Sequence, residues 1–171
     1  HIENPKEFHE KSQQLLDEIS QDDVLSSDDI KTQNKTAITE RTSVVKVRIG
    51  QSIFRKMVLD NYDSKCCFSG VDFPTLLVAS HIIPWSDREE IRLNPRNGLC
   101  LSSIHDRAFD QGLWTINENS KILISDVLKS TSSEFIEEQF LAYEGKTLFE
   151  AKNHLPEPEF FKFHRERVFK S

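Results

Sequence analysis

Apolar side chains recur at helical spacing in some stretches of the N-terminal part of the chain and alternate in others. Residues 5–20 place apolar side chains at roughly helical spacing and predict a short amphipathic helix. The polar and acidic segment 21–36 predicts a linker. Residues 42–49 alternate and are rich in β-branched side chains, which predicts a short strand. Residues 50–62 then bring five apolar side chains to one helical face and predict a longer helix: Ile53, Phe54, Met57, Val58 and Tyr62.

Short strands and helices follow one another in the middle of the chain. Residues 76–83 are rich in β-branched side chains and stop at Pro84, which predicts a strand that ends near His81. A charged surface loop is expected at 86–96. Residues 97–110 predict a turn, a short apolar stretch and then a helix.

The C-terminal third predicts a strand pair and two more helices. The apolar segments 113–116 and 121–125 flank a turn and predict two paired strands. Residues 132–143 predict a helix with Ser132 as its cap. Residues 156–169 predict a last helix that is entered through prolines and whose final residues face solvent.

The charge pattern separates the first 40 residues from the rest. They hold 4 Lys/Arg and 10 Asp/Glu, which accounts for the whole net charge of −6, whereas residues 41–171 hold 18 of each. A neutral body of this kind lacks the strong basic signature of a nucleic-acid partner, so such a partner must be argued from the site. The split favours an acidic N-terminal helix and linker, 1–40, followed by a folded domain, 41–171.

The cysteine pattern and the hydropathy indicate the cellular compartment of the protein. An odd number of cysteines, two of them adjacent, is not a disulfide framework and fits a reducing cytoplasm: Cys66, Cys67 and Cys100. No apolar run approaches the roughly 18 residues that a membrane span needs, and no signal-peptide pattern opens the chain. We therefore expect a cytoplasmic protein with no membrane partner.

Three polar positions fall where the predicted elements meet: His81 at a strand end, Asn97 in a loop, and His105-Asp106 at the start of a helix. Hydrolysis of a phosphodiester needs a base that activates water and a cation that stabilises charge on the phosphate. A histidine of near-neutral pKa suits the first task. A hard cation suits the second when one or two protein oxygens hold it and water and phosphate complete the shell. A lone histidine at a strand end is more often a partly buried structural residue. The flanking residues must therefore show whether His81 has a catalytic role.

The flanking residues resemble a known family. The segments ASHIIPW and NPRNGLCL, with the FDQG after His105-Asp106, resemble the HNH endonucleases, in the branch with Ser or Ala before the catalytic histidine, as in restriction and defence nucleases. RIGQSIFRKMVLDNYDSKCCFSG upstream, and YEGKTL and LPEPEFFKFHRERVF downstream, resemble the flanks of that branch, so the resemblance covers about residues 41–169. It implies an α+β fold with a ββα-metal core and flanking helices. It also implies a metal-dependent endonuclease that hydrolyses DNA, in restriction or antiphage defence.

The resemblance implies a role for each candidate. His81 matches the general base that takes a proton from water, and Asn97 matches the residue that braces the loop and orients the base. The third family position lies nine residues after Asn97 and is Asp106, a carboxylate suited to Mg²⁺ or Mn²⁺. His105, one residue earlier, is the second choice for this metal ligand. Asp110 is a further candidate ligand, with a purely structural role as its alternative.

The chain departs from the family at two places. Ser80 stands where an aspartate that also binds the metal often precedes the base, so Asp106 would hold the cation alone or with help from Asp110. The cysteine pairs of the family's zinc knuckle are incomplete, because Cys67 matches one position while the others hold Gly70, Ser102 and His105. A structural zinc is not expected, since stable sites need about four ligands.

Contacts to double-stranded DNA are expected mainly from cations directed at the phosphate backbone. Arg55 and Arg107 are the preferred two because they lie in the parts that resemble the family. Nothing predicts direct base readout, so specificity would come from a separate recognition domain or subunit. Cutting both strands needs two sites, which makes a homodimer a hypothesis. The remaining cationic candidates are Arg48, Lys56, Arg88, Arg92 and Arg96.

Two other functions stay open. The first is a catalytically silent DNA-binding module on the same fold, which the missing acid before His81 supports. The second is a protein-interaction domain that works through the acidic arm, residues 1–40. Both keep the predicted fold and differ from a nuclease only at the site.

Overall fold

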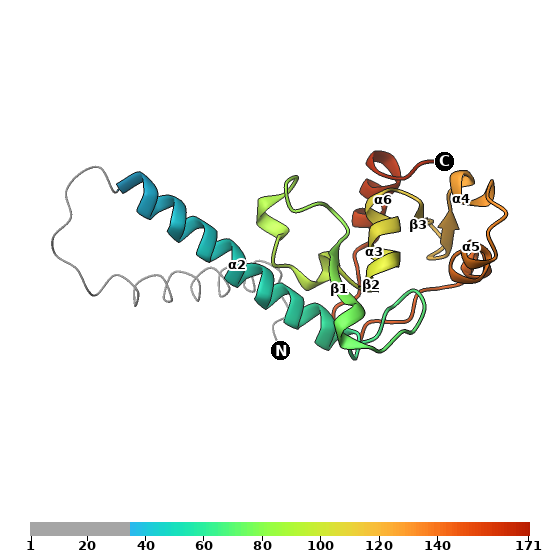
Figure 1. Ribbon diagram of the computed structural model, residues 1–171, viewed down its shortest axis with the longest axis horizontal. Coiled ribbons are helices and arrows are strands. Elements are labelled where there is room, and N and C mark those ends of the chain that lie inside the picture. Colours follow the sequence, from blue (N-terminus) through green and yellow to red (C-terminus); the bar gives the residue numbers. More distant parts are fainter. Residues whose placement is uncertain (1–34) are drawn as a thin grey trace.

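The computed structural model describes residues 35–171. The helix predicted at 5–20 and nearly all of the linker predicted at 21–36 lie outside the described residues. The described chain has the predicted α+β architecture, in which two small antiparallel sheets lie among helices (Figure 1). None of the helices in this part of the chain is long and apolar enough to cross a membrane.

A long helix, α2 (Lys35–Asn61), leads into the body of the molecule, and its N-terminal end extends beyond that body (Figure 1). The helix predicted at 50–62 is confirmed, but the strand predicted at 42–49 is wrong because the same helix includes those residues. β-Branched side chains favour a strand only weakly, whereas extending an existing helix adds a hydrogen bond for each residue fixed. The helix also runs without a break across residue 40, where the two predicted domains would meet.

The C-terminal half of α2 packs closely against strand β2 (Gly98–Ser102). Phe54 and Val58 are buried there, whereas Arg55 and Lys56 lie on the exposed face of the helix, as predicted. A Cβ atom on Gly98 would lie 2.3 Å from Cγ2 of Val58 and 2.9 Å from Cζ of Phe54. Glycine at this position therefore permits the close approach of helix and strand.

The predicted strand, strand and helix that carry the candidate residues are confirmed. Strand β1 (Leu77–His81) pairs antiparallel with β2, so that His81 lies opposite Gly98. Helix α3 (Ser103–Asp110) follows β2 directly and packs against both strands. Three 3₁₀ turns shape the chain before β1 and the loop between the strands: Pro74–Leu76, Glu89–Ile91 and Pro95–Asn97.

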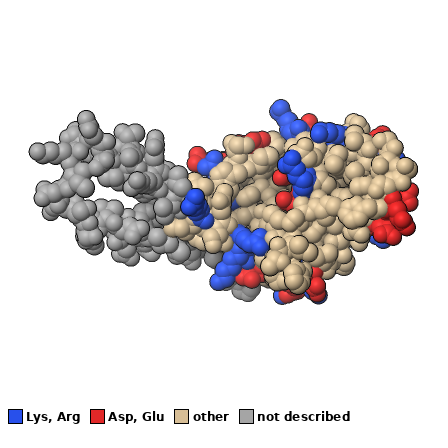
Figure 2. All heavy atoms as spheres, in the orientation of Figure 1, with Lys and Arg blue, Asp and Glu red and all other residues tan. Residues whose placement is uncertain are grey.

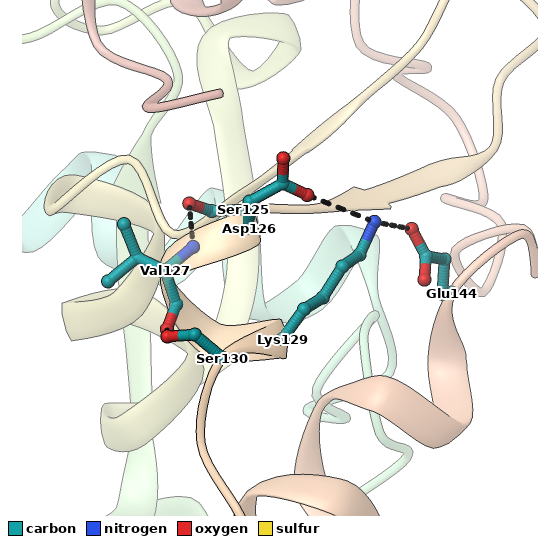
Figure 3. Close-up of polar contacts among 6 residues, drawn as sticks. All are labelled: Ser125, Asp126, Val127, Lys129, Ser130 and Glu144. Atoms are coloured by element: carbon teal, nitrogen blue, oxygen red, sulfur yellow. Dashed lines mark hydrogen bonds and ion pairs between the residues drawn. The ribbon is translucent and has the colours of Figure 1, made fainter.

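The second sheet is the predicted strand pair, β3 (Trp114–Ile116) and β4 (Ile122–Ile124). A short helix that the sequence pattern did not predict, α4 (Asp126–Lys129), follows it. The Ser125 hydroxyl caps this helix by accepting a hydrogen bond from the Val127 amide at 3.2 Å (Figure 3). Lys129 forms ion pairs with Asp126, at 3.7 Å, and with Glu144, which ties α4 to the segment after the 3₁₀ turn Leu141–Tyr143 (Figure 3).

The last two helices differ in detail from their predictions. Helix α5 (Glu134–Gln139) is shorter than predicted, and Ser133, not Ser132, holds its N-cap position without a capping side-chain hydrogen bond. Helix α6 (Pro158–Arg167) begins with a proline, as predicted.

The predicted solvent-facing end of α6 is wrong for His164, which is buried. Its ring stacks on Phe109 with 3.7 Å between the ring centroids. Phe109 and Trp114 are fully buried in the core, as expected, and Trp85 is half-buried against it. The tail after α6 also closes on Gly112, whose φ is +70° and whose carbonyl accepts a hydrogen bond from the Lys170 amide at 2.9 Å.

Candidate functional site

His81 is the last residue of β1, and its half-buried imidazole lies between two aromatic side chains. Phe54 of α2 stacks on it with 3.8 Å between ring centroids, and Trp85 meets it edge-on at 5.4 Å. Nε2 lies 2.9 Å from the carbonyl oxygen of Arg92. A carbonyl only accepts hydrogen bonds, so Nε2 carries the proton and the lone pair is on Nδ1. Nδ1 has no hydrogen-bond partner among the described residues.

The surroundings of His81 favour its neutral form. Burial lowers the pKa of His81 below its ordinary value, and the hydrogen bond to the Arg92 carbonyl raises it in part. A neutral imidazole with an unpaired Nδ1 can accept a proton from water at neutral pH.

Asn97 is buried immediately before β2 and braces the loop that begins after His81. Its side-chain oxygen accepts a hydrogen bond from the Ile83 amide at 2.8 Å, and its side-chain nitrogen donates to the Ile83 carbonyl at 3.1 Å. Its own carbonyl accepts from the Ile82 amide at 2.9 Å. The two residues after His81 are thereby fixed to the start of β2.

Asp106 lies in the first turn of α3, with its carboxylate beside the Ser80 hydroxyl. Ser80 is buried, and its Oγ has no hydrogen bond of ordinary geometry to any described residue. Partial burial raises the pKa of Asp106, while the Ser80 hydroxyl and the Arg107 guanidinium lower it in part. Because Ser80 directly precedes His81, this contact places Asp106 near the same end of β1.

Asp110 ends α3 one helical turn after Asp106, so the two carboxylates share a helix face. Partial burial raises the pKa of Asp110, the Asp106 carboxylate raises it further, and Arg107 opposes both effects. A cation placed between the two carboxylates would offset the repulsion that raises the pKa of Asp110.

His105 lies apart from these groups, with both ring nitrogens in hydrogen bonds. Nε2–H donates to the Gln139 carbonyl at 3.0 Å, and Nδ1 accepts from the Ser102 hydroxyl at 2.6 Å. The Ser69 hydroxyl and the Cys66 thiol also lie near Nδ1, at 3.5 Å and 3.8 Å. The cluster around His105 thus contains Ser102, as the incomplete zinc-knuckle pattern has it, but Cys66 and Ser69 in place of Cys67 and Gly70.

The family comparison supports the assignment of this core. A family model described as HNH endonuclease matches residues 66–117, which include His81, Asn97 and Asp106. This segment is similar to the HNH endonuclease family. The predicted resemblance is thus confirmed over the ββα core, and the matched segment makes up less than half of the chain.

One solved structure similar to the chain is described as "Modification dependent TagI restriction endonuclease". The two are 16% identical, with a TM-score of 0.49, and the similarity covers 67% of this chain and 37% of that one. The chain therefore spans little more than a third of that protein's length. No curated protein sequence matches the chain.

The donor set in the HNH segment fits a hard cation. Asp106, Asp110 and the unpartnered Ser80 hydroxyl offer oxygen atoms, which Mg²⁺ and Mn²⁺ prefer. Within residues that the structure describes, no three His, Cys, Asp or Glu side chains are grouped to hold a metal ion. The arrangement fits a cation whose shell is completed by water and phosphate, and not a closed structural site.

The predicted DNA-contact cations fall into two groups. Arg55 donates to the Leu77 carbonyl at 2.9 Å and Arg96 pairs with Glu157 at 3.6 Å, so both have partners within the fold. Arg92 pairs with Glu89 at 2.7 Å. Four others are exposed and form no ion pair with another described residue: Arg48, Lys56, Arg88 and Arg107. On the face in Figure 2, basic side chains occupy the side toward α2 and the centre, and acidic ones gather at the end that carries α4 and α5.

The structure adds contacts to His81 that the sequence did not indicate. Phe54 was predicted on the apolar face of its helix, but helical spacing does not show which ring it would touch. Arg92 was a candidate for DNA contact, yet its carbonyl holds the His81 ring. A backbone carbonyl has no side-chain signature, so no sequence pattern could have identified it.

Proposed function

We propose that the chain is a metal-dependent endonuclease that hydrolyses phosphodiester bonds of DNA, with His81 as the general base. One observation carries this proposal. His81 keeps its proton on Nε2 and leaves Nδ1 without a partner among the described residues, and the residue before it, Ser80, lies beside the Asp106 carboxylate of α3. The family match over residues 66–117 supports a nuclease at this site.

Asp106 would hold the cation, with Asp110 and the Ser80 hydroxyl as the nearest additional oxygen donors. A bound Mg²⁺ or Mn²⁺ stabilises negative charge on the phosphate. His81 accepts a proton from the attacking water at Nδ1, while Asn97 keeps the adjoining loop in place. His105 is not part of this set, because hydrogen bonds already occupy both of its nitrogens.

Double-stranded DNA is the proposed substrate, held mainly through its phosphates. Arg48, Lys56 and Arg107 are best placed for this because they are exposed without an ion-pair partner among the described residues. Arg55 contributes less directly, since it also holds the Leu77 carbonyl at the start of β1.

We also propose the setting in which this site works. The HNH domain would span residues 41–171 and follow an acidic arm, residues 1–40, in a cytoplasmic restriction or antiphage defence protein. A homodimer would supply the two sites that cutting both strands requires. A separate recognition domain or subunit would supply sequence or modification specificity. The family resemblance supports the HNH domain and the defence setting, the charge split supports the acidic arm, and the free cysteines support the cytoplasm.

A plasmid nicking assay with Mg²⁺, Mn²⁺ and a chelator tests the proposed function. We expect cleavage with either metal and none with the chelator. Asp106→Ala should lose the metal-dependent activity, because it removes the principal cation ligand. The matched variant Asp126→Ala, which changes an exposed aspartate of α4, should cleave as the parent does. Retained activity in Asp106→Ala would contradict the assignment of this ligand.

A catalytically silent DNA-binding module is the second candidate function. Ser80 at the position of a family metal ligand favours it, because the site then has fewer charged oxygens. Metal-independent DNA binding without nicking in any arm of the assay would establish it. Nicking that depends on both metal and His81 would exclude it.

A further inference from the structure

One residue of the loop between β1 and β2, Arg92, forms a hydrogen bond with the His81 side chain. Its carbonyl oxygen accepts the hydrogen bond from Nε2–H at 2.9 Å. The bond does not belong to the pairing of the two strands, so it depends on the path of the loop. Within this part of the loop the only regular element is the 3₁₀ turn Glu89–Ile91. The Arg92 amide closes this turn on the Glu89 carbonyl with a long hydrogen bond of 3.3 Å, and side-chain contacts add to the fixing of the Arg92 carbonyl.

The guanidinium of Arg92 is directed back onto its own loop. Nε donates to the Trp85 carbonyl at 2.8 Å, and Nη1 donates to the Glu89 carboxylate at 2.7 Å. The guanidinium carbon also lies over the Trp85 indole, 5.2 Å from the ring centroid. The Arg92 side chain, which is only 25% exposed, thus ties residues 85 and 89 of the loop to residue 92.

Trp85, which the Arg92 guanidinium contacts, also packs against the His81 ring. Its indole meets the imidazole edge-on, with 5.4 Å between centroids. Arg92 therefore acts on His81 twice, through its own carbonyl at Nε2 and through the tryptophan that its guanidinium holds. No other arginine among the described residues contacts the histidine in this way.

We propose that Arg92 is a positioning residue for the general base and not a contact to DNA phosphate. Its side chain fixes the loop, the loop fixes the carbonyl, and the carbonyl keeps the proton on Nε2 and the lone pair on Nδ1. This inference rests on the proposed function, in which His81 is the base. It reassigns a cation that the sequence alone placed among the DNA contacts.

Two measurements on the full chain test the proposal, using Arg92→Gln. Nitrogen NMR of the ring-labelled histidines should find His81 protonated on Nε2 in the parent chain and as a mixture of the two tautomers in the variant. The value of kcat should fall about 10–100-fold, as when a partner that orients a functional side chain is removed. KM for DNA should stay unchanged. Arg92→Lys, which keeps one donor to the loop, should lie between the two.

Lys121→Gln is the control, because it removes one positive charge from an exposed position that has no proposed role in catalysis or DNA binding. Lys121 lies directly before β4, and its side chain forms no ion pair with another described residue. The control should change neither the tautomer nor kcat. Expected results in the two Arg92 variants together with an unchanged control support the positioning role.

Two outcomes would overturn the proposal. One is a His81 tautomer that is unchanged in both Arg92 variants. The other is a raised KM with kcat retained, which is the behaviour of a phosphate contact. If the chain cuts no DNA at all, the proposed function fails, and the tautomer measurement still decides the role of Arg92 by itself. If Arg92→Gln does not fold, Arg92→Lys gives the same decision.

Discussion

The end of β1 and the cluster around α3 hold two histidines that are packed in nearly the same way. His81 stacks on Phe54 at 3.8 Å, and His105 stacks on Phe68 at 4.3 Å. Each donates its Nε2–H to a backbone carbonyl, at 2.9 Å and 3.0 Å. They differ at Nδ1, which has no partner among the described residues at His81 and accepts from Ser102 at His105. Ring stacking therefore does not distinguish the half-buried candidate base His81 from the fully buried His105, whereas the second nitrogen does.

A third histidine extends the comparison. His164 stacks on Phe109 at 3.7 Å and donates Nε2–H to the Phe109 carbonyl at 3.1 Å. Its Nδ1 accepts from the Thr115 hydroxyl at 2.9 Å. Two of the three histidines are thus fully satisfied by the fold. Of these three histidines, His81 alone has no partner for Nδ1 among the described residues.

The largest expected effect comes from removing the unsatisfied histidine. His81→Ala should lower the rate of DNA cleavage about 10²–10⁴-fold, the usual contribution of a general base. The affinity for DNA should be retained, because the variant removes no cation. Plasmid cleavage at saturating metal and a DNA-binding titration measure the two quantities. His154→Ala, which changes a half-buried histidine away from the site, serves as the control. Cleavage at the parent rate by His81→Ala would remove the base from the proposal.

The satisfied histidine should give the opposite pattern. His105→Ala leaves the Ser102 hydroxyl and the Gln139 carbonyl without their partner and opens a cavity beside Phe68. We expect a loss of about 3 kcal/mol in the free energy of unfolding, measured by urea denaturation. At temperatures where the variant is folded, cleavage should persist. A variant that is as stable as the parent but inactive would make His105 the metal ligand and Asp106 the structural residue.

Periodicity and turn residues predicted most of the site's framework. The strand ending at His81, the strand after Asn97 and the helix bearing Asp106 each follow from local patterns, and each is present. Local patterns suffice here because adjacent segments pair with one another. The family resemblance then supplied the roles that spacing alone could not.

The failures share one physical cause, which is that the partner of a segment is not encoded in that segment. Residues 42–49 have the β-branched alternation of a strand, but they continue a helix that is anchored further along by Phe54 and Val58. The polar end of the last helix suggested solvent, yet His164 finds Phe109 and Thr115 far away in the sequence. The same limit hid the Arg92 carbonyl at His81.

The pH dependence of stability tests whether His164, the third histidine compared above, is neutral in the folded protein. Burial lowers the pKa of His164 to about 4, the Phe109 carbonyl raises it in part, and Arg165 lowers it further. The unfolded chain then binds a proton near pH 6.5 that the folded chain refuses until about pH 4, so stability falls as the pH drops through this window. The loss amounts to about 3 kcal/mol at about 1.4 kcal/mol per pKa unit. His164→Gln should remove it, because glutamine does not titrate.

Urea denaturation of parent and variant at pH 7 and pH 4.5 measures this difference. Subtracting the two curves cancels the contributions of His81 and of the carboxylates, which both chains share. A parent and a His164→Gln variant that lose stability equally with acid would show that His164 is protonated in the fold. His164 could then no longer be grouped with His105 as a histidine whose two ring nitrogens are held by the fold.

The smallest expected effects come from changing Phe54 and Phe68, which stack on His81 and His105. The two changes should affect different properties of the protein. Phe54→Leu removes the stack on His81, which is worth about 0.5–1.5 kcal/mol beyond its buried area. If that energy holds the base in its reactive position, cleavage should slow by up to about tenfold, at about 1.4 kcal/mol per factor of ten. Phe68→Leu makes the identical change beneath His105. It should lower the melting temperature and leave the rate unchanged, because that ring serves only the core. Equal rate losses in both variants would mean that the rate reports general loosening of the fold, and the distinction drawn at Nδ1 would have to rest on His81→Ala alone.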